Sequence, residues 1–475
     1  MPLRRLLLAA ALLVPSGLPA QQTLPQADRR LARAILAELV AINTTRDSGA
    51  TRAARALARR LTAAGFPARD VQLAGPDPKH QNLVVRLRGR GTATPILFLA
   101  HLDVVEARRE DWSMDPFRLT ERDGWLYGRG TIDIKDEAAG LVTNLIRLRR
   151  ERYVPDGDIV VALTDHEEGG DANGVAWLLA NRREWLTARF VINLDAAGGQ
   201  MQQGRRLRMP VQTSEKIYAT YLLEVTGPGG HSSMPQPNNT IYALARGLDR
   251  LAAYAFPVRL TETTRGFFGR LGRQLGGEAG RDLQAIAAGR ADSGAVARVS
   301  ETMMYNSSMR NTCVATMLEA GHAENALPQR ARATVQCRLL PGESATAIRD
   351  TLVRIVGDTA IHVAIKGDPQ GREPRDAPES PLNPEVMAAV EAVTAALWPD
   401  VIVLPVMDPW TSDGSQLRRA GIPVYGVSGV FYDIDDDRSH GRDERVLAEA
   451  FYQGVEFNYR LMKALTSRSR PQPAP

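Results

Sequence analysis

Short apolar runs that end abruptly in polar residues are the dominant pattern in the first half of the chain. In the clearest case, residues 159–163 are apolar and mostly β-branched, and the polar sequence TDHEE follows directly at residues 164–168. Such a run predicts a buried strand that leaves its sheet at the acidic cluster. Taken alone, the pair Glu167 and Glu168 has an ordinary alternative explanation, a solvated acidic turn.

Two other apolar runs end in the same way. Residues 94–100 are followed by His101 and Asp103, and residues 190–194 are followed by Asp195. If the three strands are parallel, their ends lie at one edge of one sheet, where open α/β sheets bind ligands. Two adjacent carboxylates at that edge allow one to bind a metal ion while the other transfers protons. Three repeats of one pattern are harder to attribute to chance than a single acidic turn.

Apolar residues at helical spacing alternate with these strands and predict an α/β domain. They recur across residues 28–43, and Gly65 stands where a helix over residues 51–64 would end. Further helices are predicted over residues 137–150, 173–182, 384–397, 413–420 and 444–465, and further strands over residues 82–87, 401–406 and 423–427.

The middle of the chain, residues 213–370, has a different pattern that predicts an inserted domain. Strands over residues 219–225, 312–320 and 331–339 are interleaved with helices over residues 240–253 and 345–356, as in small α+β domains. The Gly-, Arg- and Ala-rich stretch 264–299 is expected to elaborate this lid. The predicted organisation is a signal peptide (1–20), a catalytic domain in two parts (21–212 and 371–466), the lid between them (213–370) and a disordered tail (467–475).

The first 20 residues have the features of a secretory signal peptide. Arg4 and Arg5 precede the apolar run 6–14, and small residues lead to Ala20, the expected cleavage point. An uncleaved N-terminal anchor is the alternative, although the apolar run is short for a membrane span. We therefore expect a secreted or periplasmic protein that has no membrane attachment after cleavage.

Charge, cysteine content and the lack of one catalytic motif narrow the range of possible functions. Removing the two arginines of the signal peptide leaves 57 of the 59 basic residues against 54 acidic ones, a net charge of +3, which does not favour nucleic-acid binding. Cys313 and Cys337 are compatible with one disulfide or with two buried thiols. The sequence has no G-x-S-x-G motif, so a serine hydrolase has no support.

Several longer motifs resemble the aminoacylase/carboxypeptidase/dipeptidase family of co-catalytic zinc metallopeptidases. In family order the matching sequences are FLAHLDVV, DGWLYGRGTIDIKD, TDHEEGG, NLDAAGG, GPGGHSSMP, ENALPQRARATVQCRL, WTSDGSQLRRAGIPVYG and SHGRDER. The SEKIY, GGHSS and HGRDER forms are most similar to secreted or vacuolar Gly-X carboxypeptidases and N-acyl-amino-acid hydrolases. The resemblance implies a mixed, mostly parallel sheet flanked by helices, with the inserted α+β domain serving as lid and dimerisation domain.

The resemblance also implies a ligand set for two zinc ions, although cobalt or manganese would suit similar donors. His101 and Asp195 would bind one ion, Glu168 and His440 would bind the other, and Asp133 would bridge both. One bridging carboxylate, with one His and one carboxylate for each ion, is able to hold two divalent ions about 3.5 Å apart.

Two more carboxylates would complete this centre. Glu167 would act as the general base, and Asp103 would orient His101 through its ring N–H, as metal-bound histidines usually require. Several relatives carry the carboxylate of the first metal one residue later, where this chain has Ala196, so Asp195 must serve.

Each ligand also has a purely structural interpretation. His101 could be a buried core histidine, and Asp133 could cap the helix that follows it. His440 could be a solvated loop residue, and Asp195 could cap a strand end. Asp413, similarly, could cap a helix or could stabilise the site near His440.

Three residues of the lid are expected to serve the substrate. The resemblance implies that His231 reaches across a homodimer to stabilise the oxyanion, that Arg338 binds the substrate's carboxylate with its guanidinium fork, and that Asn325 binds the substrate's backbone. A turn histidine and an exposed strand arginine are the structural alternatives.

The function expected from these features is a secreted dinuclear zinc hydrolase that cleaves amide bonds. It would act as a metallocarboxypeptidase or dipeptidase, releasing a C-terminal amino acid from short peptides or from N-acyl amino acids. The alternative is a non-catalytic module that binds peptides or metals on the same scaffold. Loss of Glu167 or of two ligands would indicate that alternative, and neither loss is seen.

Overall fold

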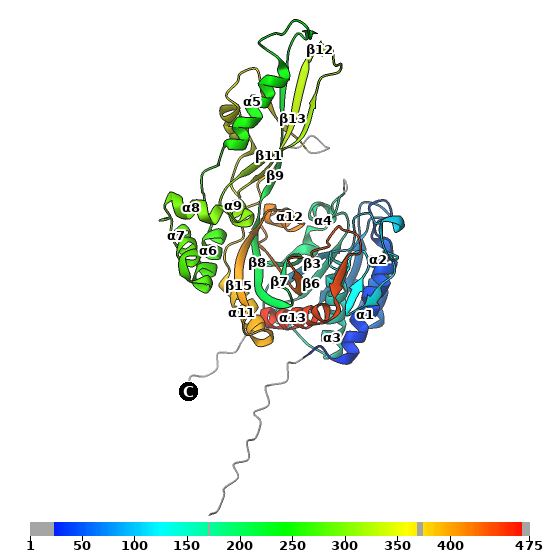
Figure 1. Cartoon of the computed structure of the whole chain (residues 1–475). Helices are drawn as coiled ribbons and strands as arrows, with labels where there is room; N and C mark the ends of the chain where they lie inside the picture. Colours follow the sequence, from blue (N-terminus) through cyan, green and yellow to red (C-terminus); the bar gives the residue numbers. More distant parts are fainter. Residues whose placement is uncertain (1–22, 170–171, 368–373, 468–475) are drawn as a thin grey trace, which may run out of the picture.

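The computed structural model describes residues 23–169, 172–367 and 374–467. Figure 1 shows a larger body, in which helices surround a curved sheet, and a narrower body that rises from it and carries α5 (Thr240–Ala253) and β13 (Arg330–Leu339). The predicted signal peptide lies outside the described residues, as does the tail from residue 468 onward. Within the described part of the chain, no helix combines the length and the apolar character needed to cross a bilayer.

The larger body is organised around an eight-stranded sheet with the order β1-β2-β6-β3-β7-β16-β8-β15. Its four central strands, β6, β3, β7 and β16, run parallel to one another. This arrangement confirms the predicted α/β class with a mixed, mostly parallel sheet. The strands are Val71–Ala74 (β1), Asn82–Leu87 (β2), Ile96–His101 (β3), Ile159–Thr164 (β6), Val191–Gln202 (β7), Arg205–Glu215 (β8), Ile402–Asp408 (β15) and Val424–Asp433 (β16).

The central strands are buried on both faces. Ile96 and Phe98 of β3 pack in one apolar core, while Leu97 and Leu99 pack in a second core on the opposite face, because side chains alternate along a strand. Burial on both faces explains the continuous apolar runs in the sequence. The first core includes residues of α1 (Gln26–Ala41), α2 (Thr51–Ala63), α3 (Lys135–Arg150), α11 (Pro384–Leu397) and α13 (Ala448–Thr466), and the second includes residues of α4 (Gly174–Asn181) and α12 (Gly414–Arg419).

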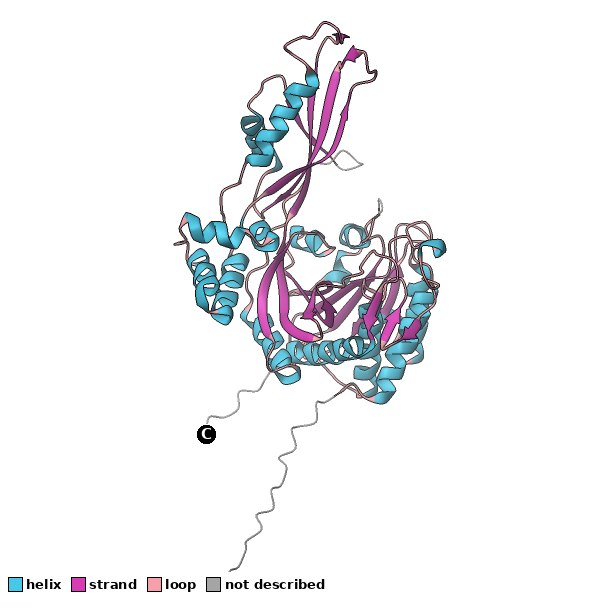
Figure 2. Ribbon diagram, viewed as in Figure 1, coloured by secondary structure: helices cyan, strands magenta, loops and turns pink. Residues whose placement is uncertain are grey.

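The narrower body is built on a four-stranded antiparallel sheet with the order β11-β13-β9-β14. Helices α5 and α10 pack against it and share its apolar core (Figure 2). Cys313 and Cys337 lie opposite each other on β11 and β13 and form a disulfide, which decides between the two alternatives left open by the sequence. The remaining elements are Ile217–Thr226 (β9), Thr312–Ala320 (β11), His362–Lys366 (β14) and Ala345–Val356 (α10).

The stretch 264–299 does not elaborate the narrower body, and that prediction is wrong. Helix α6 (Glu262–Leu275) packs against β15 of the large sheet, where Phe268 and Leu271 share a core with Leu404. Figure 1 shows α6, α7 and α8 beside the larger body. The other helices of this group are Gly277–Ala287 (α7), Ser293–Ser300 (α8) and Met303–Met309 (α9).

Some elements and boundaries also differ from those predicted. Strand β8 was not predicted, and β7 continues to Gln202, so Asp195 lies within a strand and not at its end. The last helix begins at Ala448 and not at Glu444, because residues 445–447 form a short strand instead. The short strands are Thr120–Arg122 (β4), Trp125–Tyr127 (β5), Gly230–His231 (β10), Ala326–Leu327 (β12) and Arg445–Leu447 (β17).

Candidate metal centre

Two groups of histidine and carboxylate side chains lie at the carboxyl end of the parallel strands. The first group is His101, Asp133 and Asp195, and the second is Asp133, Glu168 and His440. In each group, one potential ligand atom per residue lies within 4.8 Å of the others. Asp133 belongs to both groups, as a bridging carboxylate must. The structure thus brings together all five residues that were expected to bind metal.

His101, the last residue of β3, is buried and faces the carboxylates of the first group. Its Nε2 atom lies 3.2 Å from Oδ1 of Asp133 and 3.4 Å from Oδ1 of Asp195. Its Nδ1 atom lies 3.0 Å from the backbone carbonyl oxygen of Asp103 and 3.6 Å from that residue's carboxylate. Asp103 thus lies beside the ring N–H of His101, as expected, and its backbone carbonyl is the closer of its two orienting groups.

The carboxylate of Asp103 positions the acidic turn that follows β6. Its Oδ1 atom accepts the backbone N–H of Glu167 at 3.2 Å, and its Oδ2 atom accepts the backbone N–H of Glu168 at 3.0 Å. Burial raises the pKa of Asp103 to about 7. Asp103 thus connects the end of β3 to the residue expected to be the general base.

His440 brings a loop near the end of the chain to the second group. Its Nε2 atom lies 2.8 Å from Oε2 of Glu168 and 3.0 Å from Oδ2 of Asp133. Hydrogen bonds with Asp133 and then Glu168 raise the pKa of His440 to about 10. The ring is partly exposed, but a freely solvated loop histidine would not face two carboxylates.

Asp133 lies in a loop that a buried carboxylate holds in place. Glu444 is fully buried and accepts the backbone N–H groups of Gly130 at 3.0 Å, Ile132 at 2.9 Å and Asp133 at 3.2 Å. The same carboxylate pairs with the guanidinium of Arg129 at 2.6 Å. These contacts determine where the bridging carboxylate stands.

Sequence reasoning did not single out Glu444, whose only signal was its place in the HGRDER motif.

The structure also shows what the side chain of Asp413 contacts. It makes no helix-capping bond and instead accepts a hydrogen bond from Thr164 at 2.9 Å. Asp133 does not cap α3, whose N-cap position is Ile134. The helix-cap alternative is therefore wrong for Asp133, whereas Asp413 does occupy the N-cap position of α12, without a capping hydrogen bond from its side chain.

Burial and the neighbouring histidines and carboxylates shift the pKa values of these acids in opposite directions. For Asp133, hydrogen bonds with His101 and His440 outweigh burial and hold the pKa well below its usual range. Burial raises the pKa of Asp195 to about 7, and burial together with the nearby charge of Asp195 raises the pKa of Glu167 well above its usual range. Several buried carboxylates this close together are unfavourable unless positive charge lies nearby, and divalent cations would supply that charge. Imidazole and carboxylate donors arranged around one shared carboxylate fit two divalent cations.

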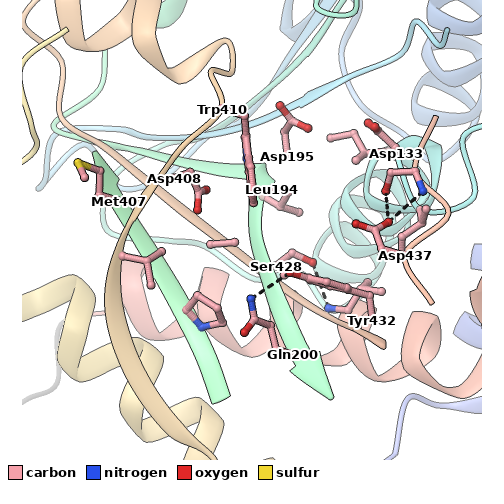
Figure 3. A pocket seen from close by; sticks show the side chains of 18 of the residues that line it. Asp133, Leu194, Asp195, Gln200, Met407, Asp408, Trp410, Ser428, Tyr432 and Asp437 are labelled. Carbon is pink, nitrogen blue, oxygen red and sulfur yellow. Dashed lines mark hydrogen bonds between the residues drawn. The ribbon is translucent and has the colours of Figure 1, made fainter. Parts of the chain in front are cut away.

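A cavity of about 580 Å³ opens directly beside this centre. One end is lined by the carboxylates of Asp133, Glu167, Glu168 and Asp195. The rest of the wall is mixed. Large apolar side chains, such as Phe267, Met304, Met407 and Trp410, lie among polar and charged ones that include Gln200, Arg208, Asp408 and Asp437. Figure 3 shows Asp133 and Asp195 on one side of the view and Met407 on the other. A cavity of this size and mixed lining suits a small ligand that carries both polar and apolar groups.

Helices α6 and α9 form part of that wall. Thr264 and Phe267 come from α6, and Met304, Tyr305 and Ser308 come from α9. These residues belong to the segment whose fold the sequence did not predict, so their place at the site was not foreseen either.

The three lid residues expected to bind substrate lie elsewhere. His231 is exposed on β10, which pairs with β12 beside Asn325, and Figure 1 shows β12 at the far end of the narrower body. Arg338 lies on β13, and its guanidinium stands 4.7 Å from the centre of the Tyr218 ring. None of the three is among the described residues that line the cavity.

A parallel α/β sheet that carries two adjoining histidine–carboxylate groups beside a cleft is the architecture of a metallohydrolase. Comparison with known proteins gives the same class and names the family. Residues 97–464 match the model of Peptidase family M20/M25/M40, and the chain belongs to this family. It is a metal-dependent amide hydrolase.

Individual relatives agree with this assignment. The N-fatty-acyl-amino acid synthase/hydrolase PM20D1 of Homo sapiens is 27% identical over 390 residues, which cover 79% of this chain and 75% of that protein. Among solved structures, the M20 family metallo-carboxypeptidase of Sulfolobus solfataricus superimposes with a TM-score of 0.66 at 17% identity, covering 92% of this chain and 99% of that one. A Bacillus subtilis M20 protein described as a dinuclear metal binding peptidase has a TM-score of 0.59 at 12% identity and covers 93% of this chain and 99% of its own.

Proposed function

We propose that this protein hydrolyses the amide bond of N-acyl amino acids whose acyl group is large and apolar, and that short peptides are its second substrate class. The observation that carries this proposal is the cavity beside the metal centre, which is lined by carboxylates at that centre and elsewhere by several large apolar side chains together with polar ones. An amide bond placed at the carboxylate end would leave its acyl chain against Phe267, Met304 and Trp410.

The residues of the centre have distinct tasks in this reaction. Two divalent cations, which we propose to be zinc with cobalt or manganese as alternatives, would polarise the scissile carbonyl group and lower the pKa of a water molecule. Glu167, whose own pKa burial raises well above its usual range, takes a proton from the attacking water and passes it to the leaving nitrogen. Asp103 holds Glu167 in place through the backbone of the turn.

The names of two relatives support the two substrate classes. The human relative is described as a hydrolase of N-fatty-acyl amino acids, and the archaeal structure is described as a carboxypeptidase. The alternative of a non-catalytic binding module has less support, because Glu167 and all five ligand positions are present and lie together.

The test is a hydrolysis assay with zinc-loaded protein and a matched substrate series. Phenylalanine carrying acyl groups of two, eight and sixteen carbons would be compared with dipeptides that have alanine or leucine at the N-terminus. We expect kcat/KM to rise with acyl length and to be greater for the leucine dipeptide. A flat or falling series would contradict the apolar-acyl proposal, and no hydrolysis of either class would contradict the proposed function as a whole.

We also propose a homodimer formed through the narrower body. Strand β11 is an edge strand of its sheet, and Val314, Met317 and Leu318 expose 59%, 58% and 64% of their surface. An open edge with apolar side chains favours pairing with a second chain. In such a dimer, His231 and Asn325 of one chain could reach the cavity of the other. Light scattering tests this, because a monomer at working concentration would remove any role of His231 across chains.

Export from the cytoplasm is a further part of the proposal. It is supported by the pattern of residues 1–20 and by the disulfide between Cys313 and Cys337, since disulfides persist mainly in oxidising compartments. Cell fractionation followed by N-terminal sequencing is the test. A mature protein that begins just after Ala20 is expected, and a cytoplasmic protein with an intact N-terminus would contradict export.

A further inference from the structure

A third group of potential metal ligands lies outside the centre described above. It consists of His80, from the loop between β1 and β2, and of Asp165 and His166, which directly follow β6. One nitrogen or oxygen atom from each residue lies within 4.8 Å of the others. The Nδ1 atom of His80 is 3.0 Å from Oδ2 of Asp165, and the rings of His80 and His166 have their centres 4.2 Å apart.

His166 is the unusual member of this group. It is only 7% exposed, and neither Nδ1 nor Nε2 of its ring has a hydrogen-bond partner within the described part of the protein. Burying an unpaired polar group is unfavourable, so buried ring nitrogens normally have a partner. The two nitrogens stand beside another imidazole and a carboxylate, which are donors of the kind that bind transition metals.

We propose that His80, Asp165 and His166 form a third cation site, which takes a divalent transition metal such as zinc. Two tetrahedral ligands at about 2.0–2.1 Å from one ion stand roughly 3.3 Å apart, so the 3.0 Å between His80 and Asp165 needs to widen by only a few tenths of an ångström. Two imidazoles and one carboxylate leave a fourth position for water, a common arrangement for zinc. The bound ion would give a ring nitrogen of His166 the partner that it lacks.

The site has a structural consequence for the catalytic turn. Asp165 also accepts the backbone N–H of Ala50 at 3.0 Å, so an ion here would join the loop of His80, the start of α2 and the end of β6. The next residues after His166 are Glu167 and Glu168. A bound ion would therefore anchor the turn that carries the general base without itself touching the substrate cavity, whose lining includes neither His80 nor His166 among the described residues.

The test counts bound zinc, and it uses variants that leave the catalytic centre intact. The full-length mature protein would be equilibrated against buffered free zinc and its metal content measured by inductively coupled plasma mass spectrometry. The informative variant is His80→Gln, and the matched control is His322→Gln, which changes an exposed lid histidine. We expect the wild type and the control to bind equal amounts, and His80→Gln to bind one ion fewer per chain.

A second measurement isolates the new site from the catalytic one. In a His101→Asn, His440→Asn double variant, which disables both ion positions of the centre, zinc should still raise Tm, because a ligand that binds only the folded state stabilises it. Adding His80→Gln to the double variant should abolish that rise. Equal zinc contents in wild type and His80→Gln, or a zinc-dependent Tm that survives the triple change, would overturn the proposal.

Discussion

The carboxylate of Glu444 accepts the backbone N–H of Asp133 at 3.2 Å, across 311 positions of the sequence. The residue shared by both ligand groups is therefore placed by a residue close to the C-terminal helix. Glu444 also pairs with Arg129, and both side chains are buried. The geometry of the centre thus depends on a buried ion pair as well as on the strands that carry the ligands.

Replacing Glu444 with Gln should weaken the centre without removing a ligand. The amide keeps the shape but leaves the charge of Arg129 buried and uncompensated, and breaking a buried pair typically destabilises a protein by about 3–5 kcal/mol. Outer groups that orient ligands typically contribute about 10–100-fold to metal affinity. Chemical denaturation and zinc titration measure the two effects. Unchanged stability and affinity would show that Glu444 does not hold the loop.

Replacing Glu167 with Gln should abolish most activity while leaving metal binding intact. Loss of a general base typically lowers kcat by about 10²–10⁴-fold. Glu167 belongs to neither ligand group, so its replacement should leave metal binding unchanged. Activity and metal content should be measured on the same preparation. The control is Glu110→Gln, an exposed glutamate, which should behave as wild type. Full activity in Glu167→Gln with its metal bound would rule out the assigned base.

The number of metal ions lost should depend on which ligand is replaced. Asp133 belongs to both ligand groups, so Asp133→Asn should lose both ions of the centre, whereas His101→Asn and His440→Asn should each lose one. A chelator should abolish activity in the wild type, and added zinc, cobalt or manganese should restore it. Activity that survives exhaustive chelation would be incompatible with a metal-dependent reaction.

A charge placed among the apolar side chains of the wall should select against long acyl chains. Met304 lines the cavity, whereas its neighbour Met303 is 86% exposed and does not. Met304→Glu should lower kcat/KM for a long-chain N-acyl amino acid at least about tenfold, or about 1.4 kcal/mol, and affect an N-acetyl substrate much less. Met303→Glu is the matched control. Equal losses for short and long substrates would place the acyl chain elsewhere.

Lys216 should contribute a part of the stability that rises with pH above neutrality. Burial, with a contribution from Arg338, lowers the pKa of Lys216 to about 7, whereas a lysine in the unfolded chain titrates near about 10.4. Between these values the unfolded state binds more protons than the folded state, so the free energy of unfolding increases with pH. The slope should therefore be less positive in Lys216→Met than in the wild type, and unchanged in Lys366→Met, an exposed lysine. Burial also lowers the pKa of Lys135 to about 7, and hydrogen bonds with carboxylates raise that of His440 to about 10, but both groups are the same in all three proteins. Urea unfolding at pH 7, 8, 9 and 10 measures the slopes.

Much of the fold and of the metal centre could be predicted from the sequence because strands buried on both faces leave a continuous apolar signal. His101 and Glu168 stand next to such strands, so their common position followed from parallel pairing. Contacts that depend on three-dimensional packing left no such signal. Glu444 looks like one acid among several in a charged loop, and nothing in its neighbourhood predicts complete burial.

The segment of α6 to α9 shows the other limit. Its helices are short and rich in glycine and arginine, and their apolar residues make sense only against Leu404 of β15. Residues such as Phe267 and Met304 therefore could not be assigned to the cavity from periodicity alone. His231 and Arg338 illustrate a different gap, because neither lines the cavity in the single chain, and motif resemblance alone does not place them.

The disulfide between Cys313 and Cys337 ties the outermost strand of the narrower body to its neighbour. An isolated chain therefore already presents β11 as an ordered ribbon, with Val314 and Leu318 facing solvent. Association of two chains would then be a docking of preformed surfaces, with no ordering step to slow it. Reducing agents would be expected to weaken self-association before they affect the distant metal centre.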